Sequence, residues 1–156
     1  MKEIDLAYMA GILDGEGCIG IHRSGMKPNG NPRYFLRVSI GICNEYIPNL
    51  FKFHFGGRID FYQPLKENWH PQWRWTVTCN KAAQCLNVLL PYLKLKEKEA
   101  MLGIQYQSEK KNHSGSQKGL NGGGVPETNE ELALIESQRI LMHNLKDKTE
   151  VINGQM

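Results

Sequence analysis

The sequence has 156 residues, of which 40% are hydrophobic and 22% charged, the composition of an ordinary globular domain. No apolar run approaches the roughly 18–20 residues that a membrane-spanning helix needs, and the start lacks the basic and apolar pattern of a leader peptide. These features disfavour membrane and secreted proteins. We therefore expect an intracellular protein, although nothing distinguishes a chloroplast, mitochondrial, bacterial or phage setting.

The net charge is +3, and the basic residues are concentrated in the middle of the chain. Between Cys18 and Thr78, eight Lys and Arg residues stand against three acids. A basic segment favours a polyanionic partner such as nucleic acid, although a solvated surface can have the same composition. The four cysteines form no C-x-x-C pair and have no histidine at zinc-ligand spacing, so we expect reduced thiols.

Helix and strand patterns alternate in the first third of the chain. The first predicted element is a helix at Leu6–Asp14, with Asp5 as its N-cap. Strand periodicity follows at Cys18–Arg23, and a stretch rich in Gly, Asn and Pro at 24–32 predicts a hairpin loop. The clearest strand comes next, over 35–42, because an aliphatic side chain occupies every second position.

The same order of elements then repeats in the middle of the chain. A short helix is predicted at Pro48–Phe55, because proline suits a first helical turn and two glycines follow. Alternation over 58–62 and 72–78 predicts two more strands around a polar loop. Asn80 is the expected N-cap of a third helix, which extends to about Leu90.

The last third is predicted to hold two helices around a loop. One helix covers roughly 96–107, and a final amphipathic helix covers about 130–145. The expected apolar side of the final helix consists of Leu134, Ile135, Leu141 and Leu145. We divide the chain into a core domain at 1–107, a flexible loop at 108–126, and a C-terminal helix and tail at 127–156.

The order of elements predicts an α+β fold, αββαββα, with a four-stranded antiparallel sheet covered by helices on its apolar face. The other face would be bare and polar, which suits a DNA groove, where Arg, His, Gln and Ser reach base edges and phosphates. A merely solvated sheet face is an equal alternative. The predicted DNA-binding residues are Gly20, His22, Ser24, Lys27, Arg33, Arg37, Ser39, Arg58, Asp60, Tyr62, Gln72, Arg74 and Thr76.

The segment MAGILDGEG at 9–17 places two acids, Asp14 and Glu16, where a helix is predicted to end. Carboxylates are unfavourable there, because a helix C-terminus carries partial negative charge. A bound divalent cation would offset the repulsion, and Mg²⁺ takes hard oxygen ligands of this kind. A metal site is thus one interpretation of the pair.

The same helix carries small residues on one side, Ala7, Ala10 and Gly11. Two copies packed there would bring their acidic ends together and create a metal cluster suited to phosphodiester hydrolysis. The alternative is a buried helix that happens to end in an acidic turn.

This segment resembles the LAGLIDADG signature of the homing endonucleases at nearly every position. The segment PYLKLKEKEA at 91–100 is similar to the basic segment of members that carry one signature, and the resemblance extends over about 4–107. It implies a homodimer that binds double-stranded DNA and hydrolyses both strands of a long, pseudo-palindromic site. It also implies Mg²⁺ as cofactor, with Mn²⁺ or Ca²⁺ able to substitute in binding, and no small-molecule substrate.

The resemblance implies roles for individual residues. Glu16 matches the essential metal ligand, and Gly15 the residue that lends its backbone carbonyl to a metal. Asp14 would support the helix end at the dimer interface. Lys96 matches the active-site lysine, and Asn44 a polar residue that positions water. Most members have Asp where this chain has Glu16, and the longer side chain could shift the metal.

Three other functions remain open from the sequence. The first is a maturase-like protein that binds intron RNA on the same scaffold. The second is a catalytically inactive DNA-binding regulator, which the glutamate in place of aspartate allows. The third is an interaction domain with a polar sheet face.

Overall fold

The computed structural model describes residues 2–27, 30–65, 69–113 and 127–153. Within them the chain forms helices, strands and one short 3₁₀-helix, η1. Their bounds are α1 Glu3–Glu16, β1 Gly17–Met26, β2 Pro32–Ile42, α2 Tyr46–Phe55, β3 Arg58–Tyr62, β4 Gln72–Thr78, α3 Cys79–Leu89, η1 Leu90–Tyr92, α4 Glu97–His113 and α5 Asn129–Asn153.

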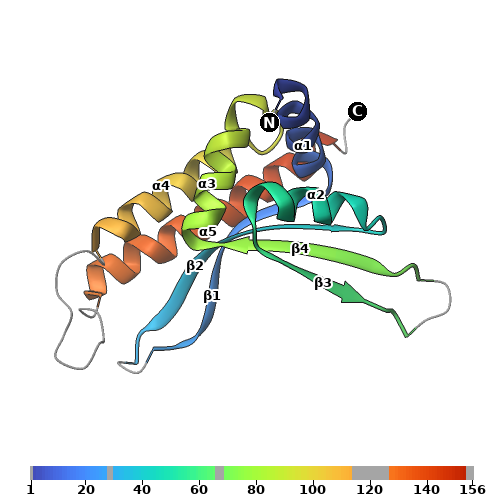
Figure 1. The fold of residues 1–156 in the computed structure, drawn as a ribbon. Helices are drawn as coiled ribbons and strands as arrows, with labels where there is room; N and C mark the ends of the chain where they lie inside the picture. Colours follow the sequence, from blue (N-terminus) through green and yellow to red (C-terminus); the bar gives the residue numbers. More distant parts are fainter. Residues whose placement is uncertain (1, 28–29, 66–68, 114–126, 154–156) are drawn as a thin grey trace.

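The strands form a four-stranded sheet in the order β1-β2-β4-β3, and every neighbouring pair is antiparallel. The helices lie together on one side of it, while the two hairpins, β1–β2 and β3–β4, spread apart on the other (Figure 1). The predicted α+β fold is therefore confirmed. We call the sheet surface away from the helices the open face.

Alternation along β2 decides which side chains enter the core. Leu36, Val38 and Ile40 are completely buried beneath the helices. Their neighbours on the adjacent strands continue the same layer, because Val38 lies opposite both Ile19 of β1 and Val77 of β4. This layer confirms the predicted strand periodicity and orients the polar side chains toward the open face.

Tryptophan and glycine fix the turn that leads into β3. The buried indole of Trp75 packs against Phe51 of α2, with 5.0 Å between ring centroids, and donates a hydrogen bond to the Gly56 carbonyl oxygen at 2.7 Å. Gly57 has φ +86°, and a Cβ there would lie 2.4 Å from the Thr76 carbonyl oxygen. Glycine is therefore required where α2 turns into the sheet.

The helix starts differ from two predictions. Helix α1 begins at Glu3, so Asp5 is not its N-cap; Asp5 instead accepts a hydrogen bond from the Lys2 backbone N–H at 3.2 Å. An acid can serve a helix start from the third position as well as from the cap. Asn80 likewise lies inside α3, where its side-chain oxygen accepts a hydrogen bond from Gln107 at 2.8 Å.

The prediction that a loop begins right after Gln107 is wrong, because α4 continues to His113. Contacts within α4 and with other elements stabilise this extension. Glu109 accepts hydrogen bonds from Gln105 at 2.8 Å and from Gln138 of α5 at 2.7 Å. Lys110 donates to the Tyr34 carbonyl oxygen. The remainder of the predicted loop, 114–126, lies outside the described residues.

Helix α5 is longer than predicted, and its buried side is only partly the predicted one. Ile135 and Leu145 pack against the core as expected, but Leu134 and Leu141 are exposed, and Gln138 and Met142 are buried. The buried amide of Gln138 is satisfied by its bond to α4. Across the described part of the chain, no helix has the length and apolarity needed to cross a membrane.

Candidate active site and nucleic-acid interface

Asp14 is buried and held by hydrogen bonds at the end of α1. Its side chain is only 8% exposed. One carboxylate oxygen accepts a hydrogen bond from the Lys94 backbone N–H at 2.8 Å, and the other from the Lys96 backbone N–H at 3.0 Å. These two bonds offset the unfavourable position of a carboxylate at a helix C-terminus. Asp14 therefore ties the segment before α4 to the end of α1.

The side chain of Lys96 makes a third hydrogen bond to Asp14. Its ammonium group donates to the Asp14 backbone carbonyl oxygen. A helix leaves its last carbonyl groups without helical partners, and a cation there is favourable. We call Asp14, Gly15, Glu16 and Lys96 the α1 tip. Gly15 and Glu16 are exposed at this tip, and Glu16 has no ion pair with another described residue.

Asn44 lies at the same end of the sheet. Gly17 is paired with Ile40, so β2 leaves the sheet where α1 enters β1. The exposed Asn44 follows shortly after, and its side-chain oxygen accepts a hydrogen bond from the Tyr46 backbone N–H at 2.8 Å. This bond gives Asn44 a structural role at the start of α2 and leaves its NH₂ group to orient another molecule.

The chain by itself offers few metal ligands at the α1 tip. Among the described residues, no three His, Cys, Asp or Glu side chains gather closely enough to hold an ion. The oxygens of Asp14 are already hydrogen-bonded, so the Glu16 carboxylate and the Gly15 carbonyl are the available donors. Both are hard oxygen ligands of the kind Mg²⁺ prefers. These two donors are fewer than a magnesium ion needs, so they fit the ion only as part of a larger ligand set.

The outer side of α1 carries exposed apolar and small residues. Ile4 is 74% exposed and Tyr8 53% exposed, and Ala7 and Gly11 lie beside them one turn apart. No atom lies within 4 Å of where a Cβ on Gly11 would be. Ala10, predicted to share this surface, is completely buried in the core of its own protomer. The surface available to a partner therefore differs from the predicted one.

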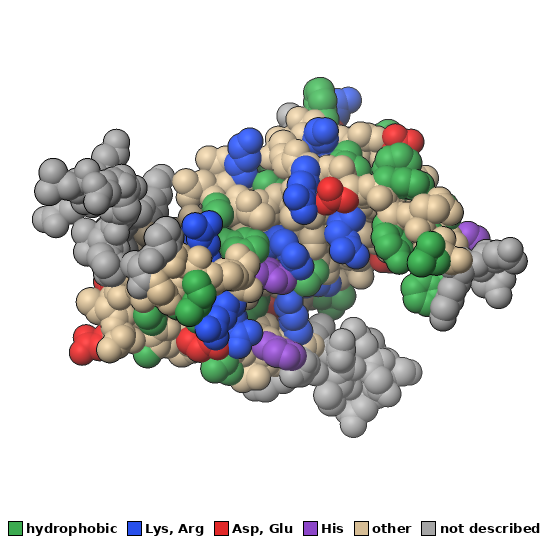
Figure 2. Space-filling view, turned by 90° about the horizontal axis from the view of Figure 1, so that it is seen from below, with side chains coloured by type: hydrophobic (Ala, Val, Ile, Leu, Met, Phe, Trp, Pro, Cys, Tyr) green, Lys and Arg blue, Asp and Glu red, His purple; other side chains and the backbone are tan. Residues whose placement is uncertain are grey.

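The open face carries most of the residues predicted to bind DNA. Arg58, Asp60, Tyr62, Gln72 and Arg74 are exposed on the β3–β4 hairpin. Lys and Arg side chains gather over the middle of the face, with hydrophobic side chains toward one end (Figure 2).

Several predicted contacts are less accessible. Gly20, Ser39 and Thr76 lie on the open face of the sheet but are buried. At the far end of the β1–β2 hairpin, Arg33 and Ser24 lie opposite each other and remain exposed, whereas Lys27 forms an ion pair with Glu127 that partly buries both groups.

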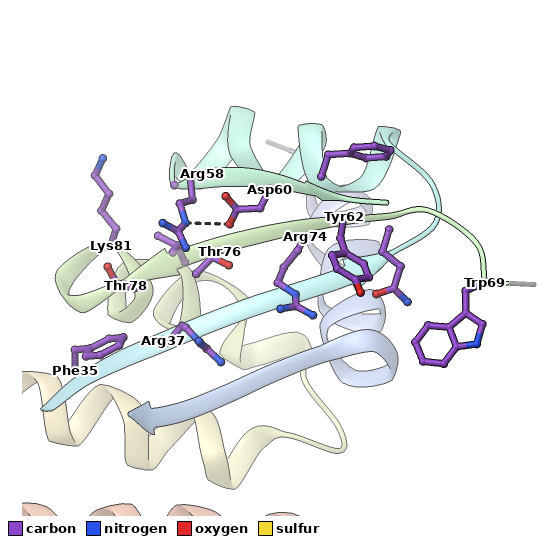
Figure 3. A pocket seen from close by; sticks show the side chains of 14 residues that line it. Phe35, Arg37, Arg58, Asp60, Tyr62, Trp69, Arg74, Thr76, Thr78 and Lys81 are labelled. Atoms are coloured by element: carbon purple, nitrogen blue, oxygen red, sulfur yellow. Dashed lines mark ion pairs between the residues drawn. The ribbon is translucent and has the colours of Figure 1, made fainter. Parts of the chain in front are cut away.

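A hollow of about 930 Å³ lies in the open face and spans β2, β3 and β4. Arg37, Arg58 and Arg74 line it together with Tyr62 (Figure 3). The sequence-based set missed further lining residues, among them Phe35, Trp69, Thr78 and Lys81. The alternation of β2 and β4 placed Phe35 and Thr78 on this face, but Trp69 and Lys81 lie beyond the strand ends, where alternation gives no signal.

His22 stands at the β1 edge of the open face in a positive environment. Burial, with the nearby charges of Arg37 and Lys146, lowers the pKa of His22 to about 4. Its Nε2 atom and the Nε atom of Arg37 are buried and make no hydrogen bond to another described residue. Lys146 comes from α5 and donates to the sulfur of Cys18 at 3.3 Å. This contribution of α5 has no sequence signal, because it depends on long-range packing.

The four-stranded sheet, its helical cover and α1 leading directly into β1 define the fold of the LAGLIDADG homing endonucleases. The chain is similar to the homing endonuclease I-CvuI, in a crystal structure with the I-CreI target and Mg in which the DNA is not cleaved. The TM-score is 0.70 with 18% identity, and the match covers 92% of this chain and 82% of I-CvuI.

Two further structures have the same fold. The archaeal intron-encoded homing endonuclease I-Vdi141I, complexed with DNA, matches with a TM-score of 0.59 and 17% identity over 90% of this chain and 99% of its own. The LAGLIDADG homing endonuclease I-SmaMI, bound to cleaved DNA, matches with a TM-score of 0.61 and 18% identity over 86% of this chain but 42% of its own. No protein-family model and no curated protein sequence matches this chain.

Proposed function

We propose that this protein is a site-specific DNA endonuclease that acts as a homodimer. It hydrolyses both strands of a long, pseudo-palindromic duplex with a divalent metal ion. The observation that carries the proposal is the α1 tip, where an exposed Glu16 and a fixed Lys96 lie at the point at which α1 enters a basic sheet. Catalytic and DNA-binding groups thus adjoin one another.

The homodimer follows from the incomplete tip. One protomer supplies the Glu16 carboxylate and the Gly15 carbonyl, which is half of a metal site. Close packing of two α1 helices across Ala7 and Gly11 would bring two tips together and bury the exposed Ile4. The match to I-SmaMI is consistent with this arrangement, because this chain aligns with less than half of that longer one.

Each residue of the tip has a distinct task. Glu16 and Gly15 would hold Mg²⁺, which as a Lewis acid stabilises negative charge on the phosphate oxygens. Lys96 places its ammonium group beside the same phosphate, held there by the backbone bonds to Asp14. Asn44 orients a water molecule through its NH₂ group. I-CvuI has been crystallised with DNA in the presence of Mg and in the presence of Ca, so both ions suit the binding experiments.

The open face would lie in the major groove on either side of the cleavage site. Arg37, Arg58 and Arg74 provide positive charge and donors for base edges, and Gln72 can pair with adenine. A dimer presents this surface twice, related by a two-fold axis. The target should therefore have two similar halves.

The direct test is a selection for cleaved molecules from a library of random duplex DNA, with Mg²⁺ in one arm and EDTA in the other. We expect one palindrome-like sequence to be enriched in the Mg²⁺ arm and nothing in the EDTA arm. Competition of the enriched duplex against structured RNA separates this function from RNA binding. Enrichment that is equal in both arms, or tighter binding to the RNA, would contradict the proposal.

A further inference from the structure

Asp60 is an unusual residue for its surroundings. Of the described residues that line the hollow in the open face, it is the only acid, among Arg37, Arg58, Arg74 and Lys81. A carboxylate on a DNA-binding surface repels the phosphates and lowers affinity for every sequence. Its presence therefore calls for a function other than general attraction to DNA.

Asp60 forms an ion pair along its own strand and not across the sheet. Arg74 of β4 lies directly opposite Asp60 in the register. The carboxylate nevertheless contacts Arg58, two residues earlier on the same face of β3, with 3.0 Å between Asp60 Oδ2 and Arg58 Nε (Figure 3). Arg74 extends over β2 instead, where its Nε lies 3.9 Å from the position of a Cβ on Gly41.

This ion pair contributes little to folding. The side chains of Arg58 and Asp60 are 76% and 52% exposed, and exposed pairs of this kind add almost nothing to stability. The pair restrains the guanidinium more strongly when bound DNA displaces the surrounding water, because the attraction strengthens as the effective dielectric constant falls. A guanidinium group is planar and rigid, so a contact at Nε restricts the orientation of the entire group. With the contact at Nε, the two terminal nitrogens remain for a ligand.

A fixed pair of terminal N–H groups in the major groove matches the N7 and O6 acceptors of guanine. We propose that Asp60 holds Arg58 in the orientation that recognises guanine, so that each protomer requires a G·C pair at one position of its half-site. Asp60 is a positioning residue that acts through Arg58. This inference rests on the proposed function, because it takes double-stranded DNA as the ligand.

The test measures binding in EDTA, so that cleavage does not interfere. A binding selection with the wild-type protein identifies the site, and duplexes with one base pair changed then give the preference at each position. The variants are Arg58→Ala, Asp60→Ala and the double variant. Glu130→Ala removes an exposed acid from α5, away from the open face, and controls for the change in net charge.

We expect Arg58→Ala to reduce the preference for G·C at one position, repeated in the two half-sites, by roughly ten-fold. Asp60→Ala should reduce the same preference by roughly three-fold or more while raising the affinity for unrelated DNA. It should have no further effect on that preference once Arg58 is absent. Glu130→Ala should leave base preference unchanged, and thermal unfolding of the variants should match the wild type.

Three results would overturn the inference without affecting the proposed function. Asp60→Ala could leave every preference unchanged, it could alter a preference in the Arg58→Ala background, or Arg58→Ala could alter none. A wild-type protein that binds DNA with no base preference would overturn the proposed function together with this inference.

Discussion

The α1 tip and the open face differ in how their polar groups are held. At the tip, Asp14 is buried and each of its oxygens accepts a backbone hydrogen bond, so Lys96 has a fixed position. On the open face, Arg58 and Asp60 are exposed and form an ion pair with each other. The tip therefore depends on the fold of the protomer, whereas the surface residues can be changed without disturbing the core.

This difference suggests that cleavage and DNA binding are separable. Catalysis needs groups held within a narrow range of positions, which the buried bonds of the tip provide. Binding needs charge and donors over a wide surface, which exposed side chains on a rigid sheet provide. Changes at the α1 tip should therefore reduce the cleavage rate of bound DNA without changing the affinity. Changes on the open face should alter the affinity without changing the cleavage rate of DNA that is bound.

The largest effect is expected from Gly11→Leu on α1. The added side chain has free space in the protomer but would collide with a second α1 helix, so the dimer should dissociate and cleavage should fall to background. Leucine also favours helix over glycine, so the protomer should be up to about 1 kcal/mol more stable. Sedimentation measures the mass, and Ser108→Leu at an exposed position of α4 is the control. An unchanged dimer mass would refute packing across Gly11.

Lys96→Met should reduce the cleavage rate by roughly 100-fold, because a fixed positive group near the phosphate is lost. The dissociation constant for the same duplex should change by less than roughly three-fold, since one of many charges is removed. Lys94→Met and Lys98→Met are matched controls, because both side chains are exposed neighbours. If either control loses as much activity as Lys96→Met, then Lys96 has no special role.

Asp14→Ala should lower the free energy of unfolding by about 2–3 kcal/mol, because two partly buried N–H groups lose their acceptors. Urea denaturation measures the loss. Asp14→Asn keeps one acceptor oxygen and a similar volume, so its loss should be smaller. A variant with alanine that is as stable as the wild type would show that these bonds do not hold the tip together.

The smallest effect concerns His22. Nuclear magnetic resonance titration should give a pKa for His22 of about 4, because burial and the charges of Arg37 and Lys146 disfavour the proton. The unfolded chain binds that proton already near pH 6.5, so stability should decline as the pH falls from about 6.5 to about 4. Lys146→Met should raise the pKa modestly. An ordinary pKa of His22 in the wild type would contradict the buried placement.

The sequence predicted the sheet because a period of two is a strong local signal. The alternation of β2 separated Leu36 and Val38 from Arg37, and the structure has the same division. The acidic segment likewise predicted an unusual helix end, although it placed that end at Asp14 and α1 continues to Glu16. Both features are encoded by neighbouring residues.

What the sequence did not reveal depends on distant contacts. Asp14 is satisfied by backbone groups eighty residues away, so its intrachain role has no local signature. The buried side of α5 was predicted correctly at Ile135 and Leu145 but wrongly at Leu134 and Leu141, because Gln138, bonded to Glu109 of α4, and Met142 are buried in their place. The predicted dimer surface included Ala10 for the same reason, since helix spacing alone does not say which side meets the core.

The central claim is that the exposed carboxylate of Glu16 serves cleavage and not binding. Glu16→Gln keeps the size of the side chain and removes its charge, and Glu97→Gln alters a nearby exposed acid as a control. Cleavage in Mg²⁺ and binding in Ca²⁺ should be measured on the same selected duplex. We expect Glu16→Gln to lose cleavage by at least roughly 100-fold at nearly unchanged affinity. A variant that still cuts at the wild-type rate would contradict the account.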